Sequence, residues 1–137
     1  MAITDVDPLV FVSYRRSDAA GHARALYRDL CRRFDKDRIF FDRESLEAGS
    51  VFPERLREGI QSCRVFLALI GPDWLDARSA DGGRRLDRED DVVRQELATA
   101  LDLGKAIIPV TFDDTPVPPA SDLPPPLRAL VDHDVLM

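Results

Sequence analysis

Val65-Phe66-Leu67-Ala68-Leu69-Ile70 is an unbroken run of six apolar residues, and Gly71-Pro72 ends it. A run of this length without polar alternation is typical of a strand that is buried on both faces of a parallel sheet. We therefore expect this segment to lie at the centre of the fold, with the remaining elements arranged around it.

Shorter apolar runs and helical patterns alternate on either side of this segment. The further strands are expected at residues 9–13, 38–41, 106–112 and 134–137. The helical patterns are expected at residues 17–34, 53–63 and 90–104. Strands that alternate with helices predict an α/β domain, in which helices cover both faces of a parallel sheet. Pro109 indicates an edge-side or bulged position in its strand, because proline cannot donate to a sheet.

Composition and charge limit the classes of protein to which this chain can belong. The 137 residues, 45% hydrophobic and 32% charged, are typical of one globular domain. We place that domain at residues 9–137, after an acidic tail at residues 1–8. A net charge of −6 argues against nucleic acid as a direct partner, because phosphate binding needs a concentrated basic surface. The tail lacks a signal-peptide core, and no run reaches the roughly 18 apolar residues of a membrane span.

Cysteine and histidine usage points to a cytoplasmic protein without a metal site. Cys31 and Cys63 are the two cysteines and both fall in helix-like patterns, so we interpret them as buried free thiols in a reducing cytosol. His22 and His133 are far apart in sequence, and no CxxC motif is present. No metal is therefore expected.

The carboxyl ends of the predicted strands form the expected ligand site, as in other open parallel sheets. Turns and loops at 14–18, 42–50, 71–76 and 78–89 fall at this edge, and we expect the last of them to be mobile. No GxGxxG, P-loop or GxSxG motif is present, which argues against dehydrogenase, NTPase and serine-hydrolase chemistry. A receiver-type phosphoacceptor is conceivable, but Arg15-Arg16 stands where its acidic cluster is expected.

Carboxylates remain the candidate chemical groups: Asp42, Glu47 and Glu96. A single carboxylate beside a ribose can stabilise an oxocarbenium-like transition state. In the 90–104 helix, Asp91 is expected in the first turn and Gly104 at the C-terminal cap. Glu96 is expected at the edge of the apolar face, where it is partly desolvated; a solvated helix glutamate is the alternative.

Four motifs in this order resemble those of the TIR (Toll/interleukin-1 receptor) domain family, in its bacterial, NAD-cleaving branch. They are Phe11-Val12-Ser13-Tyr14-Arg15-Arg16, Phe41-Asp42 with Leu46-Glu47-Ala48-Gly49, Leu69-Ile70-Gly71-Pro72, and Val93-Arg94-Gln95-Glu96. The resemblance implies a flavodoxin-like three-layer fold with a five-stranded parallel sheet. It also implies that NAD+ is cleaved, as a substrate and with no cofactor, to nicotinamide and ADP-ribose or a cyclic form.

The resemblance also assigns site residues. Glu96 matches the catalytic glutamate, while Tyr14 and Arg15 match the turn that lines the nucleotide pocket. Arg16 is expected to reach a phosphate, with a surface ion pair to Asp18 as an equal alternative. Asp42, Leu46 and Gly49 belong to the loop that gates the pocket and contacts a neighbouring subunit, and Gly49 would supply a left-handed backbone position. Trp74 matches the pocket wall, although packing at a helix start is the other interpretation.

Two departures from the family pattern bear on function. Val92 stands where catalytic relatives carry an aromatic residue, and loss of a stacking ring would cost about 1–3 kcal/mol. The family's final helix would follow Met137. Either this sequence stops short of that helix, or the native protein continues there into a linker and a sensing domain.

Two functions therefore stay open. One is an NAD+-cleaving enzyme of defence or signalling that is activated when TIR domains assemble. The other is a non-catalytic scaffold that acts through contacts between TIR domains. For the enzyme, we expect a lone domain to leave Glu96 open to water, which weakens charge stabilisation.

Overall fold

The computed structural model describes residues 10–34, 39–41, 53–89 and 91–132. Its centre is a parallel sheet of four described strands in the order β2-β1-β3-β4. The strands are β1 (Val10–Ser13), β2 (Ile39–Phe41), β3 (Val65–Ile70) and β4 (Ala106–Thr111). β3 pairs with β1 on one side and with β4 on the other, as expected for the longest apolar run. The predicted strand at 134–137 lies outside the described residues.

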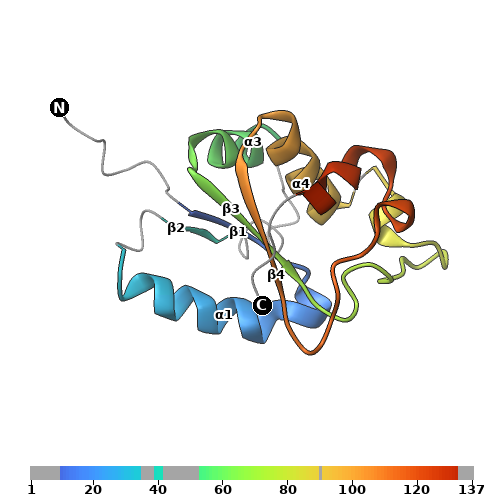
Figure 1. The fold of residues 1–137 in the computed structure, drawn as a ribbon, viewed down its shortest axis with the longest axis horizontal. Coiled ribbons are helices and arrows are strands. Elements are labelled where there is room, and N and C mark those ends of the chain that lie inside the picture. Colours follow the sequence, from blue (N-terminus) through green and yellow to red (C-terminus); the bar gives the residue numbers. More distant parts are fainter. Residues whose placement is uncertain (1–9, 35–38, 42–52, 90, 133–137) are drawn as a thin grey trace.

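Helices cover both faces of the sheet, which confirms the three-layer α/β fold (Figure 1). α1 (Arg16–Cys31) lies on one face, whereas α3 (Pro53–Ser62) and α4 (Val92–Asp102) lie on the other. The short helix η3 (Ala120–Asp122) contacts η4 (Pro125–Asp132), and η4 packs against α4. Within the described ranges, no helix is both long and apolar enough to cross a bilayer.

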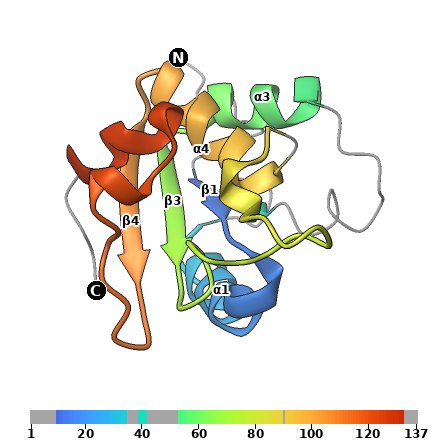
Figure 2. The same cartoon turned by 90° about the vertical axis from the view of Figure 1, so that its right-hand side faces the viewer.

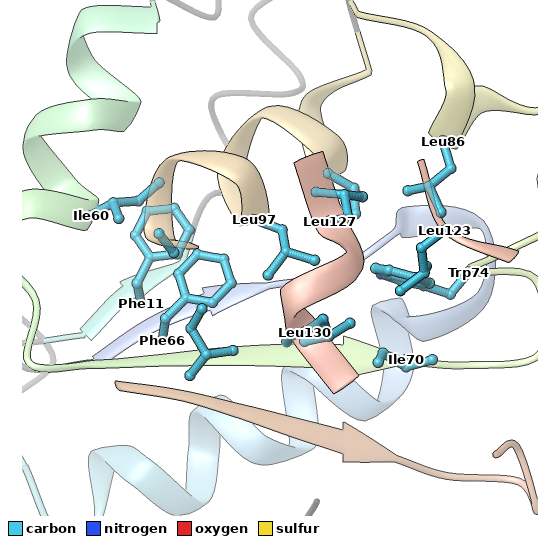
Figure 3. Packing of buried hydrophobic residues seen from close by; sticks show 14 of the residues in the cluster. Phe11, Ile60, Phe66, Ile70, Trp74, Leu86, Leu97, Leu123, Leu127 and Leu130 are labelled. Atoms are coloured by element: carbon cyan, nitrogen blue, oxygen red, sulfur yellow. The ribbon is translucent and has the colours of Figure 1, made fainter. Parts of the chain in front are cut away.

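The alternation of side chains along β1 and β3 divides the core in two. Val12 and Leu67 face α1, together with Ala23 of that helix. Phe11 and Phe66 face the opposite layer, and their rings stack with centroids 5.2 Å apart (Figure 3). Aromatic pairs of this kind contribute about 0.5–1.5 kcal/mol beyond the area they bury.

The segment before α4 is more structured than the sequence predicted. We expected a mobile loop at residues 78–89, whereas the structure has local order there: Arg78 and Arg84 form a β-bridge and η2 (Arg85–Asp87) follows. Leu86 is fully buried and lies near Trp74 and Leu123 in the core (Figure 3). One apolar side chain in a polar segment gives no periodic signal, so only the packing reveals that this segment is folded onto the domain.

Candidate active site

The candidate site lies where the chain changes direction across the sheet. From β1 the chain continues to β2 on one side, and β3 then pairs with β1 on the other side. Ligands of open α/β sheets bind at such a switch point, beyond the carboxyl ends of the strands. The turn after β1 and the turn that contains Trp74 after β3 both leave the sheet here, and α4 crosses above β1 (Figure 2).

Glu96 is fully buried on α4, with 0% of its surface exposed. The Ser13 hydroxyl, itself buried at the end of β1, donates a hydrogen bond of 2.8 Å to Glu96 Oε1. A buried carboxylate needs such donors, because leaving water without them costs several kcal/mol. The site therefore holds one desolvated carboxylate in a defined orientation.

The sequence placed Glu96 at the edge of the buried face, and this was wrong. α4 contacts β1 and α3, and also η2 and η4. Neighbours on several sides bury a wider arc of the helix than the apolar stripe alone indicates. For the same reason the expectation that a lone domain leaves Glu96 open to water does not hold.

Arg15 is buried and bound by protein groups from two other segments. Its Nη1 and Nη2 donate to the two carboxylate oxygens of Asp91 at 3.0 Å each, and its Nε donates to the Trp74 carbonyl at 3.3 Å. Only 3% of the Arg15 side chain and 8% of the Asp91 side chain are exposed. A bidentate pair of this kind is both strong and geometrically specific.

Asp91 caps α4 rather than lying in its first turn. Its side chain accepts a hydrogen bond of 3.1 Å from the backbone N–H of Arg94. Arg94 in turn donates from Nη1 to the Leu86 carbonyl at 3.3 Å. The start of the Glu96 helix is thus attached to β1, through Arg15, and to the folded segment before it.

The remaining predicted site residues are distributed more widely. Tyr14 is buried in the cluster that faces α1, on the opposite side of the sheet from Glu96. Trp74 is 1% exposed and packs in the core with Leu86, which agrees with the packing interpretation (Figure 3). Arg16 begins α1, and its side chain lies outside what the structure describes.

The loop residues assigned from the family pattern, Asp42, Leu46 and Gly49, lie outside the described residues, so their roles stay predictions. Glu47 belongs to the same segment.

Sequence reasoning missed Ser13 and the pairing role of Asp91. Ser13 carried a signal, because alternation puts it on the same face as Phe11, which is the face that α4 covers. No sequence signal indicated that Asp91 pairs with Arg15, because the two residues are 76 positions apart in the chain.

The basic residues near the site are largely engaged by acidic ones. Arg84 donates two hydrogen bonds to the Asp87 carboxylate, at 2.8 and 2.9 Å. These bonds lower the pKa of Asp87, and Arg84 remains charged. Arg88 pairs with Asp81 at 2.9 Å. The charges of Arg84 and Arg88 are therefore each balanced by a neighbouring carboxylate. Among the described residues, no three metal-ligating side chains gather.

Comparison with known proteins agrees with this architecture. Residues 10–134 match the family model described as the TIR domain. The NAD(+) hydrolase SARM1 of Danio rerio is 34% identical over 125 residues, which are 90% of this chain and 16% of that protein. The probable 2' cyclic ADP-D-ribose synthase BdTIR of Brachypodium distachyon is 30% identical over 129 residues, which are 93% of this chain and 49% of that protein. The chain thus spans less than half the length of these relatives.

Solved structures support the fold. A metazoan TIR-STING receptor from C. gigas, in complex with 2',3'-cGAMP, superposes with a TM-score of 0.59 at 19% identity over 93% of this chain and 35% of that one. A further structure of a metazoan TIR-STING receptor from C. gigas gives 0.56 at 18% identity, over 98% of this chain and 39% of that one. With the family match over almost the whole described fold, these findings establish that the chain belongs to the TIR domain family.

Proposed function

We propose that this TIR domain cleaves the bond between nicotinamide and ribose in NAD+, with Glu96 as the catalytic carboxylate. The observation that carries the proposal is the fully buried Glu96 carboxylate at the switch point, which accepts a hydrogen bond from Ser13. The names of the two relatives, an NAD(+) hydrolase and a cyclic ADP-D-ribose synthase, point to the same bond.

The chemistry follows from the charge that develops on the sugar. As the C1'–N bond breaks, its electron pair leaves with nicotinamide and the ribose becomes cationic. A fixed negative charge in a site shielded from water stabilises this cation far more than it would in bulk water. Water then attacks C1' and loses a proton to give ADP-ribose; attack by a hydroxyl of the same molecule gives a cyclic product instead.

The proposal requires the site to open. Because Glu96 is 0% exposed, the ribose reaches it only in a conformation that differs from this structure around α4. We propose that contacts with other TIR domains stabilise that conformation, in a cytoplasmic defence or signalling role triggered by a sensing domain.

The test compares Glu96→Gln with a matched control. Glutamine keeps the size of the side chain and an acceptor for Ser13 but removes the negative charge. We expect nicotinamide release to fall roughly 10²–10³-fold, as is usual when one charge-stabilising group is lost. Glu58→Gln, on the exposed surface of α3, should keep wild-type turnover. Nicotinamide is measured by chromatography at high protein concentration, and wild-type turnover in Glu96→Gln would refute the assignment.

A scaffold without catalysis is the second candidate, and Val92 favours it. At the position where catalytic relatives carry an aromatic ring, this chain has a half-buried valine that packs against the core. A wild-type domain that self-associates by light scattering but releases no nicotinamide would support the scaffold over the enzyme.

A further inference from the structure

Two side chains at the end of β1 contact α4 at two points. Ser13 donates to Glu96, and Arg15, two residues later in extended backbone, donates to Asp91. Two residues of extended chain span roughly 6.6 Å. The five helical steps from Asp91 to Glu96 span roughly 7.5 Å. The two contacts therefore match in spacing, and together they fix α4 both along its axis and about it.

The Arg15 contact is the stronger of the two. It consists of two charge-assisted hydrogen bonds in a nearly water-free environment, where such bonds are stronger than in water. The Nε bond to the Trp74 carbonyl adds the turn after β3. Arg15 thus ties β1, β3 and α4 together beside the candidate carboxylate.

We propose that Asp91 is a positioning residue for NAD+ cleavage, which acts by binding Arg15 and so holding Glu96 against Ser13. The proposal rests on the function proposed above. It also changes the role of Arg15, from a ligand of the nucleotide to the partner that Asp91 needs.

Asp91→Asn separates this role from helix capping. Asparagine is as good an N-cap as aspartate, so the bond from the Arg94 N–H is retained. The negative charge and the bidentate pairing with Arg15 are lost. Asp102→Asn makes the same chemical change at the exposed C-terminal end of α4, and serves as the matched control.

The experiment measures steady-state NAD+ cleavage by the wild type, Asp91→Asn, Arg15→Gln, the double variant and Asp102→Asn. We expect Asp91→Asn and Arg15→Gln each to lower kcat on the order of 10²-fold, as for a displaced catalytic group. KM should stay within about threefold, because an orienting contact acts on the chemical step. The double variant should lose no more than the worse single variant, since both act through one contact. Asp102→Asn should match the wild type.

Two results would overturn the proposal. One is wild-type kcat in Asp91→Asn. The other is an Arg15→Gln variant that raises KM while Asp91→Asn does not, which would make Arg15 a substrate ligand. Each single substitution leaves a buried charge without its partner and risks unfolding the domain. If a lowered Tm shows that a single variant is unfolded, the double variant is measured in its place. A wild-type kcat in the double variant would overturn the proposal equally.

Failure of the proposed function gives a different result. If the wild type cleaves no NAD+ at any concentration, both the proposed enzymatic function and the positioning role of Asp91 are refuted. If the wild type is active and Asp91→Asn has the same kcat, only the positioning role of Asp91 is refuted.

Discussion

At the scale of single residues, the candidate site at the carboxyl end of the sheet depends on hydrogen bonds between buried polar groups. The Ser13 hydroxyl binds Glu96, and the Asp91 carboxylate binds Arg15. In each pair, removing one member leaves the other desolvated, which costs about 1–3 kcal/mol for a hydrogen-bonding group. Both pairs therefore contribute to the stability of this end of the sheet, and we expect them to bear on the proposed NAD+ cleavage as well.

Cys63 provides a residue-scale prediction about reactivity. Burial raises the pKa of its thiol, although the nearby Lys105 ammonium acts in the opposite direction. The thiol also donates to the Ile60 carbonyl at 3.0 Å. We expect a disulfide reagent at pH 8 to label half-buried Cys31 in the native domain and Cys63 at least about 100-fold more slowly, because Cys63 reacts only when the core opens.

Mass spectrometry of the labelled protein, with Cys31→Ser and Cys63→Ser as references, identifies each thiol. Equal labelling rates at the two positions would show that the core around Cys63 opens readily.

At the scale of elements, both ends of α4 have specific caps. Asp91 closes the N-terminus, and Gly104 follows the C-terminus with φ +69°. The Lys105 N–H bonds back to the Ala100 carbonyl at 3.0 Å, so the last turn is closed by the chain that leads into β4. Because Glu96 lies between these caps, the ends of the helix contribute to holding it in place.

Gly104→Ala and Gly21→Ala form a matched pair. A Cβ at either position would meet nothing within 4 Å, so packing does not decide the outcome. At Gly104 the left-handed backbone should cost about 1–2 kcal/mol of unfolding free energy. At Gly21, inside α1, alanine should add about 0.4–1 kcal/mol. Urea unfolding measures both, and a change of the same sign in the two variants would contradict the backbone conformation of Gly104.

At the scale of the whole molecule, the described site is closed. Glu96 has no exposed surface, and the turn after β3 and the start of α4 are joined through Arg15. Opening such a site costs free energy, and a partner that binds the open form more tightly shifts the population toward it. We therefore expect catalysis to depend on assembly because assembly gives the substrate access to Glu96, and not because it excludes water from the site.

The corresponding prediction is that specific activity rises with protein concentration. NAD+ turnover per milligram is measured across a wide dilution series, with mass in solution followed by light scattering. The domain should be nearly silent as a dilute monomer and active as larger species form. Constant specific activity in a sample that stays monomeric would refute the dependence on assembly.

Much of the fold was predictable because its signals are local. Apolar runs located the four described strands, including the central position of β3, and helical spacing located α4 with Gly104 after its end. Pro109 falls in β4, the outermost described strand on its side of the sheet; the predicted strand at 134–137, which would decide whether β4 is an edge, lies outside the described residues. The order of motifs was enough to indicate the TIR family and to single out Glu96.

The tertiary structure alone decided how the site is built. Ser13 and Glu96 are 83 residues apart, and Arg15 and Asp91 are 76 apart. Periodicity reports which face of an element is apolar, but it does not report which elements pack on the other faces. For that reason the sequence determined that a carboxylate stands on α4, whereas its complete burial, its serine donor and the ion pair beside it follow only from the packing of distant segments.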